Sequence, residues 1–257
     1  MSVRPPAVAG TFYPADPREL AAAVDGMLST AEAHAGPPPV ALVAPHAGYV
    51  YSGPIAASAY ALLRGSELRR VAILGPAHYV PLRGCAVPAA DAWASPLGQV
   101  PVDAAAREAV GVPADDGPFE PEHSLEVQLP FLQRVLVGGF SVLPIAVGAC
   151  PPSDVADVIG LLPPDVFVVV STDLSHYHDD ANAKRLDRRT AQAVLALDPE
   201  AIGPEDACGA FALRGLVEHA HRRGLVAELL DLRTSADTAG DPRRVVGYGA
   251  FAFREPA

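Results

Sequence analysis

Short apolar runs, rich in valine, place the strongest constraint on the fold of this chain. The clearest is Val166–Val170, which holds five apolar residues, four of them β-branched valines. Val40–Ala44 and Val71–Leu74 are runs of the same kind, with five and four residues. Continuous apolar runs of this length are typical of parallel strands that are buried on both faces. Parallel strands need long crossover connections, which are usually helices. The chain is therefore expected to alternate strands with helices.

Helical patterns lie between the runs, as this interpretation requires. Leu20, Val24 and Leu28 recur at helical spacing after Pro17. Other expected helices are Gly53–Leu63, Ala104–Val110, Ser124–Val137 with a kink at Pro130, Ser153–Leu162 with Ser153 as N-cap, Asp180–Leu197, and Cys208–Arg223 ended by Gly224. Other expected strands are Phe140–Val147, Val226–Leu232, Val245–Phe253 and antiparallel pieces within residues 84–103. We expect residues 1–257 to form a single α/β domain, with a central mixed, largely parallel sheet flanked by helices.

Composition excludes several classes of partner. The net charge is −11, and the basic residues form no cluster beyond His221–Arg223 and Arg243-Arg244, so nucleic acid and anionic membranes are not expected partners. No segment approaches the roughly 18 consecutive apolar residues of a membrane span. The first residues lack the apolar core of a signal peptide, so we expect a cytoplasmic protein. Three widely separated cysteines argue against a disulfide framework.

Histidines follow the apolar runs. His46 comes shortly after Val40–Ala44, and His78 shortly after Val71–Leu74. His176 follows Val166–Val170 in the same way. Ligands of open α/β sheets bind beyond the carboxyl ends of the strands, so side chains far apart in the sequence can meet there. We therefore expect these histidines to converge on one site. The alternative is that each is an ordinary loop histidine that bonds the backbone.

An acid precedes the third histidine. Asp173 and His176 are three residues apart, and a carboxylate at that spacing can orient an imidazole and raise its basicity. This predicts an acid/base pair. The alternative is that Asp173 or Ser175 caps a helix and the histidines face solvent. His178 lies either beside the site or on the surface.

Cys208 precedes Gly209 at the expected start of a helix. The helix dipole favours a thiolate there, so the pKa of the thiol is expected to be lowered. Thiolate is also the form that binds metals. The alternative is a small buried apolar residue, which describes Cys85 and Cys150 better.

The remaining histidines divide by position. His123 ends an acidic loop and is expected to line the pocket, although its neighbour Glu122 is also placed to complement a helix dipole. His34 lies in a connector of prolines and glycines and is expected to be exposed. His219 and His221 lie near a helix C-terminus and are expected to complement its dipole. The chain has no Gly-x-Ser-x-Gly, P-loop, Cys-x-x-Cys or His-Glu-x-x-His motif.

An ordered set of short motifs resembles the Memo family, called AmmeMemoRadiSam system protein B in bacteria and archaea. The motifs are Ala9-Gly-Thr-Phe-Tyr-Pro14, Ala44-Pro-His-Ala-Gly-Tyr49, Gly75-Pro-Ala-His78, Glu122-His-Ser-Leu-Glu126, Ser171-Thr-Asp-Leu-Ser-His176 and Cys208-Gly209. The resemblance implies a fold like that of class III extradiol, non-haem iron dioxygenases. By motif, His46 and His78 match the two metal-binding histidines of those enzymes. His176 matches their acid/base histidine, and Cys208 stands where they have a ligating carboxylate.

The cysteine in place of a carboxylate determines which metal and which function we expect. Thiolate in place of carboxylate softens the donor set, so we expect one metal ion at His46, His78 and Cys208, iron or copper before zinc. We expect His123 and Tyr49 to contact a substrate. The first function is a metal-dependent, redox or oxygenase-type enzyme. The second is a non-catalytic binding module for a peptide or small molecule, because animal Memo relatives are associated with phosphotyrosyl receptor peptides. The family's bacterial name implies a third, partnership with a radical-SAM protein.

Overall fold

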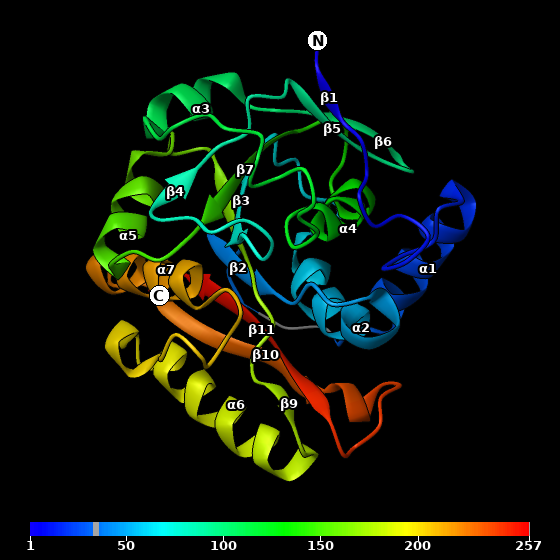
Figure 1. Cartoon of the computed structure of the whole chain (residues 1–257), viewed down its shortest axis with the longest axis vertical. Coiled ribbons are helices and arrows are strands. Elements are labelled where there is room, and N and C mark those ends of the chain that lie inside the picture. Colours follow the sequence, from blue (N-terminus) through cyan, green and yellow to red (C-terminus); the bar gives the residue numbers. More distant parts are fainter. Residues whose placement is uncertain (33–35, 257) are drawn as a thin grey trace.

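Four parallel strands form the centre of the main sheet, and they are the apolar runs of the sequence (Figure 1). The computed structural model describes residues 1–32 and 36–256, so His34 lies outside the described residues. The parallel strands are, in spatial order, β2 (Ala41–Ala44), β8 (Phe167–Ser171), β3 (Arg70–Pro76) and β7 (Ser141–Val147). In the register Leu42 lies beside Val169, and Val169 beside Ile73. All three side chains are fully buried, which explains why these strands need continuous apolar sequence.

Antiparallel strands complete the sheet at both edges. β11 (Val245–Arg254) pairs with β2, and β10 (Val226–Thr234) pairs with β11. β4 (Cys85–Ala86) pairs with β7 at the opposite edge. A smaller sheet holds β1 (Val3–Arg4), β5 (Ala92–Ser95) and β6 (Gly98–Pro101). The mixed, largely parallel sheet and the antiparallel pieces within residues 84–103 are therefore confirmed.

Helices cover both faces of the main sheet. Figure 1 shows α1 (Pro17–Thr30), α2 (Tyr49–Tyr60) and α4 (Leu129–Val135) on one side. On the other side lie α5 (Pro152–Leu161), α6 (Asp180–Leu195) and α7 (Ala210–Arg223), and α3 (Ala104–Val110) packs near α5. Short 3-10 turns are η1 (Ala61–Leu63), η2 (Glu126–Gln128), η3 (Pro199–Ala201) and η4 (Ser235–Asp237). The α/β architecture with flanking helices is confirmed.

Several element boundaries differ from expectation. Ser153 is not an N-cap, because α5 begins at Pro152 and its cap is Pro151. The helix expected over Ser124–Val137 is divided into η2 and α4, and Pro130 lies in the first turn of α4, where a missing N–H costs nothing. Gly224 ends α7 in the left-handed conformation as expected, with φ 65°. Cys208, however, precedes α7, which starts at Ala210 with Gly209 as its cap.

One unexpected strand borders the site. β9 (His176–His178) pairs antiparallel with the start of β11. The pairing is irregular between Val245 and Val246. β9 therefore extends the sheet just beyond the carboxyl end of β8, where the histidine motif lies.

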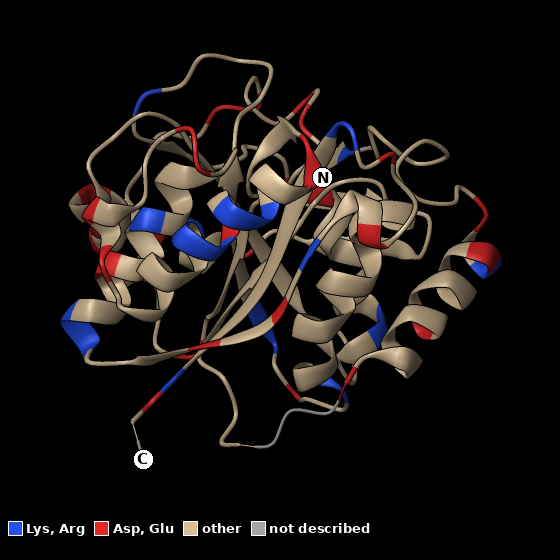
Figure 2. Ribbon diagram, turned by 90° about the horizontal axis from the view of Figure 1, so that it is seen from below, with Lys and Arg blue, Asp and Glu red and all other residues tan. Residues whose placement is uncertain are grey.

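Charged residues of both signs are distributed over the helices. Figure 2 shows Lys and Arg positions interspersed with Asp and Glu positions along the helices. Most of the arginines in ion pairs contact a carboxylate at the surface, as Arg134 does with Asp25 and Arg222 with Asp157. Across residues 1–32 and 36–256, none of the helices is both long and apolar enough to cross a membrane.

Candidate metal centre

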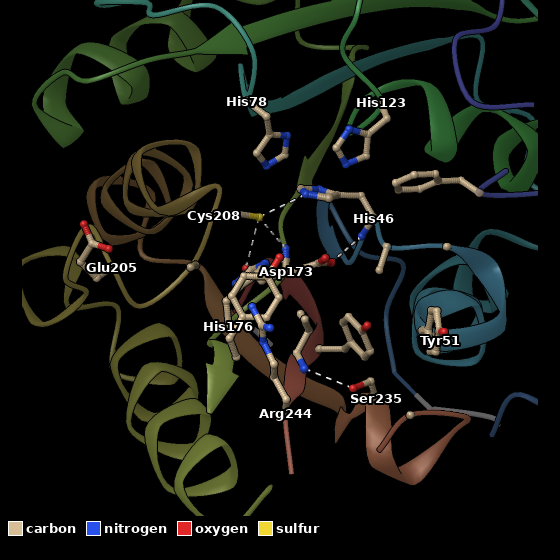
Figure 3. Close-up of a pocket in the computed structure, with 18 of the residues that line it drawn as sticks. His46, Tyr51, His78, His123, Asp173, His176, Glu205, Cys208, Ser235 and Arg244 are labelled. Carbon is tan, nitrogen blue, oxygen red and sulfur yellow. Dashed lines mark hydrogen bonds between the residues drawn. The ribbon is translucent and has the colours of Figure 1, made fainter. Parts of the chain in front are cut away.

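Three side chains from distant segments meet at the carboxyl end of the parallel strands. They are His46 after β2, His78 after β3 and Cys208 before α7, and their ligand atoms all lie within 4.8 Å of one another. The Sγ atom of Cys208 is 3.1 Å from Nε2 of His46. Figure 3 shows these three side chains and His123 converging. The convergence expected from the strand-end positions is therefore present for His46 and His78, whereas His176 lines the same cavity without belonging to this group.

His46 is held so that Nε2 faces the thiol. Its backbone N–H donates to Oδ1 of Asp173 at 2.7 Å, and its Nδ1 lies 2.9 Å from Oγ of Ser171. The Ser171 hydroxyl donates to the backbone oxygen of Ser124, so toward His46 it acts as an acceptor. This assigns the proton of His46 to Nδ1 and leaves a lone pair on Nε2. Burial, and then the rings of His78 and His123, lower the pKa of His46 well below its ordinary value, which keeps the ring neutral.

Glu122 performs the same task for His78. Its fully buried carboxylate accepts from the His78 backbone N–H at 2.6 Å and lies 2.9 Å from His78 Nδ1. It also accepts from the backbone N–H groups of His123 and Ser124. Burial alone raises the pKa of Glu122, but the hydrogen bond and charge of His78, together with these N–H groups, lower it to about 2. The ionised carboxylate therefore fixes the proton of His78 on Nδ1, an arrangement common around metal-binding histidines.

His123 lies against both histidine ligands. Its ring stacks on His78 with centroids 4.8 Å apart and planes 14° apart, and it meets His46 edge-on at 5.5 Å. Burial lowers the pKa of His123 to about 4, so the ring is neutral near pH 7. His78, Glu122 and His123 also form a second group with metal-ligand spacing. The structure brings His123 into the site, as expected.

Cys208 is present at the site, but its thiol differs from expectation. Burial, and then the charge of Asp173, raise the pKa of the Cys208 thiol, whereas the helix position predicted a lowered value. The prediction was wrong because the sulfur lies ahead of the first turn of α7, in a half-buried position where lost solvation disfavours the thiolate. A Cβ on Gly209 would lie 2.9 Å from the backbone oxygen of Ser171, so only glycine lets Cys208 approach β8 this closely. A bound metal would displace the thiol proton.

Asp173 and His176 do not form the expected pair. Asp173 accepts from the backbone N–H of His46, while Nδ1 of His176 lies 2.7 Å from the backbone oxygen of Leu174. The segment is extended, so side chains three residues apart do not face each other as they do on a helix. Burial raises the pKa of Asp173 to about 7 and lowers the pKa of His176. The Nε2 atom of His176 remains available on the cavity side.

A cavity of about 820 Å³ adjoins the converging side chains. Its lining includes His46, His78, His123, Asp173, His176 and Cys208, together with the aromatic residues Phe12, Tyr51, Tyr79, Tyr177 and Tyr248. Tyr49, expected to contact a substrate, does not line this cavity, because its ring is buried and its hydroxyl donates to the backbone oxygen of Val127. Tyr51 lines the cavity instead. Two residues along a helix turn the side chain to nearly the opposite face.

The sequence interpretation missed the residues that orient the ligands. Nothing in the sequence links Glu122 to His78, and Ser171 stands out there only as the first residue of a motif. Gln128, fully buried in η2, donates to Oγ of Ser171 at 2.7 Å and completes the support of His46. A polar residue next to an otherwise buried apolar segment is the signal that identifies such positions, because buried polar groups need partners.

Comparisons with known proteins agree with the motifs. A family model described as "Memo-like protein" matches residues 4–252. A MEMO1 family protein of Methanopyrus kandleri is 36% identical to this chain, covering 98% of it and 99% of the relative. MEMO1 family proteins of Archaeoglobus fulgidus and Aquifex aeolicus are each 36% identical, covering 98% of this chain and 100% of the relative. This chain belongs to the Memo family.

Proposed function

We propose that the protein binds one metal ion through His46, His78 and Cys208 and performs redox or oxygenase-type chemistry on a small molecule in the adjoining cavity. The observation that carries the proposal is the convergence of two imidazole nitrogens, from His46 and His78, and the sulfur of Cys208 within 4.8 Å. Both histidines have their Nδ1 atoms engaged by buried oxygens, so Nε2 is the atom left for a metal. That division of the two ring nitrogens is the usual one around a metal ion.

The donor set and its spacing suit a transition metal. Two ligands of a tetrahedral metal with ordinary bond lengths are about 3.3–3.8 Å apart, and the contact between Cys208 Sγ and His46 Nε2 is 3.1 Å. Imidazole and thiolate donors favour iron, copper or zinc over magnesium or calcium. Iron or copper accounts for redox chemistry, and three protein ligands leave positions open toward the cavity. When bound, the metal would supply a redox-active Lewis acid there.

The chain's own groups have separate tasks in this proposal. His176 is neutral and its Nε2 lines the cavity, so it can take a proton from a bound substrate and return it to the product. Asp173 holds the backbone of His46 and keeps that ligand in place. His123 lies flat against His78 and is placed to contact the substrate beside the metal. The aromatic walls exclude water from the reacting group.

Metal analysis after anaerobic purification tests the proposal. We expect one equivalent of iron or copper in the native protein and none in Cys208→Ser. Cys150→Ser is the matched control, because Cys150 does not line the cavity and should leave the metal content unchanged. Full metal retention in Cys208→Ser and in His46→Ala would contradict the ligand assignment. Absence of metal from every sample, even after reconstitution, would favour a non-catalytic pocket for a peptide or small molecule.

Partnership with a radical-SAM protein rests on the family resemblance. Co-expression followed by co-purification tests it. Recovery of this chain without the partner would count against that association, and would leave the metal proposal unaffected.

A further inference from the structure

A single permanent cation borders the cavity. Among the described residues that line it, Arg244 alone is a lysine or arginine. Arg244 lies in the turn that precedes β11. Figure 3 shows it at the end of the lining away from His78 and His123. A ligand that fills the cavity can therefore reach the metal centre at one end and Arg244 at the other.

In the part of the chain that the structure describes, the guanidinium of Arg244 has no acidic partner. Its side chain instead packs against the aromatic face of Tyr177. It lies 4.4 Å from the ring centroid of Tyr177. Its neighbour Arg243 differs, because Asp241 accepts from two of the guanidinium nitrogens of Arg243. Stacking on Tyr177 restricts the Arg244 side chain while leaving its N–H donors free to bind an acceptor.

The backbone on both sides of this contact is unusual. Tyr177 has φ 65°, a left-handed conformation that is costly for a residue with a bulky side chain. Opposite it, the pairing of β9 with β11 is irregular between Val245 and Val246, directly after Arg244. Irregular pairing often re-aims side chains beside functional sites, and strained residues persist where the surroundings enforce them. Both features lie directly beside the contact between Tyr177 and Arg244.

The other walls specify the rest of the ligand. Tyr51 and Tyr79 line the cavity although they are 40% and 57% exposed, so flat apolar faces border its opening. Such faces suit a planar ring. The charges of the lining favour a ligand with a single negative charge. Asp241 is paired with Arg243, so Arg244 is left to bind one anionic group, and Glu205 contributes a negative charge of its own to the lining. A planar guanidinium binds a carboxylate through two parallel hydrogen bonds.

We propose that the cavity binds an aromatic monocarboxylate, with its carboxylate on Arg244 and its ring directed toward the metal centre. This names the substrate class of the proposed function and rests on that function for the chemistry at the ring. The carboxylate contact itself needs no metal, which allows the two to be tested separately.

Calorimetric titration with benzoate, and with benzamide as its neutral counterpart, tests the proposal. We expect benzoate to bind the native protein and Arg222→Gln equally, because Arg222 pairs with surface carboxylates away from the cavity. It should bind Arg244→Gln about tenfold more weakly, the loss expected for one charged, two-bond contact. Arg244→Lys should give an intermediate affinity, because it keeps the charge and loses the paired geometry. Benzamide should not distinguish the four proteins.

Three results would overturn the proposal. They are equal benzoate affinity in Arg244→Gln and Arg222→Gln, equal affinity of benzoate and benzamide in the native protein, and tighter binding of phenyl phosphate than of benzoate. Thermal melts of the variants check that each is folded, and Arg244→Lys provides a second test if Arg244→Gln is not.

The metal-free and metal-loaded proteins are both titrated, which keeps the two proposals distinguishable. Loss of benzoate affinity in Arg244→Gln without metal supports the carboxylate site, whatever the metal analysis of Cys208→Ser shows. Unchanged benzoate affinity in Arg244→Gln, in a protein that holds its metal, overturns the carboxylate site alone.

Discussion

Each histidine ligand of the centre depends on one buried oxygen at Nδ1. For His78 that oxygen belongs to Glu122, whose pKa of about 2 keeps the carboxylate ionised near neutral pH. For His46 it belongs to Ser171, which is fixed in turn by Gln128 and by the backbone of Ser124. In each ring Nδ1 is engaged by an oxygen, and Nε2 is the nitrogen left for a metal. Pre-orientation of this kind strengthens metal binding.

Glu122→Gln should weaken metal binding. The amide loses the charge and has one oxygen, so its NH2 group would face either the backbone N–H of His78, which donates to Oε2, or the three N–H donors at Oε1. We expect metal affinity to fall by about 10- to 100-fold, the usual effect of removing such a partner. Competition with a chelator measures it. Glu120→Gln is the control, because Glu120 is exposed in the same loop. Equal affinities of the two variants would show that Glu122 does not orient a ligand.

At this scale the sequence predicts ligands better than it predicts their support. The convergence of His46 and His78 could be predicted because strand ends of a parallel sheet converge, which is a general property of the fold. The role of Asp173 could not be predicted, because spacing along the chain does not show which backbone N–H group a carboxylate will reach. The raised pKa of the Cys208 thiol could not be predicted either. It depends on how the segment before α7 packs against β8, which the position of a cysteine before a helix does not show.

The helices of one face position the segments that carry the site. Asp187 of α6 is buried and its Oδ1 accepts from the backbone N–H of Ser175, the residue before His176. Its Oδ2 has no hydrogen-bond partner among the described groups. Burial raises the pKa of Asp187, so the folded protein holds this proton more tightly than the unfolded chain does.

This gives a pH dependence with a definite sign. The stability contributed by protonated Asp187 is complete below the unfolded value of about 3.9, and is lost as pH rises through the raised folded pKa. Asp187→Asn removes that loss. We therefore expect the free energy of unfolding of the variant, relative to the native protein, to increase from about pH 4 toward about pH 7. Urea denaturation across this range measures it. A constant difference between the two proteins would contradict the prediction.

The contact between α5 and α7 provides a steric test. A Cβ on Gly215 of α7 would lie 2.3 Å from Cβ of Val155 in α5. Gly215→Ala should therefore lower the free energy of unfolding by about 1–3 kcal/mol, as overpacked cores do. Gly160→Ala in α5 is the control, since nothing lies within 4 Å of its added methyl and helix propensity favours alanine. Adding Val155→Ala to Gly215→Ala should recover part of the loss in chemical denaturation.

Most helices and strands could be predicted because their patterns are local. The valine runs and the helical spacing of Leu20, Val24 and Leu28 identify their elements without reference to the rest of the fold. β9 could not be predicted in this way. It has three residues, one of them in the left-handed conformation, and its pairing depends on β11 almost seventy residues later. The N-cap of α5 was misplaced because Ser153 has the favoured side chain but lies within the first turn.

The whole molecule should gain stability from the metal. A saturating ion joins the loop after β2, the loop after β3 and the segment before α7, and it has no equivalent site in the unfolded chain. At about 100 times the dissociation constant, binding adds about 2.7 kcal/mol, which corresponds to a rise in Tm of about 5–10 °C. Calorimetric melts of metal-free and metal-loaded protein measure the shift. Cys208→Ser should show little of it, and an equal shift in that variant would place the metal elsewhere.

The order of the ligands along the chain also affects how the protein is made. Cys208 follows His46 by 162 residues, so both histidines leave the ribosome long before the thiol. A nascent chain carries no complete donor set, and products of premature termination before Cys208 carry none either. If the proposed ligand set holds a metal, insertion of the ion would follow synthesis of α6 and the docking of Cys208 against β8, and metal loading would be a late event in the maturation of this protein.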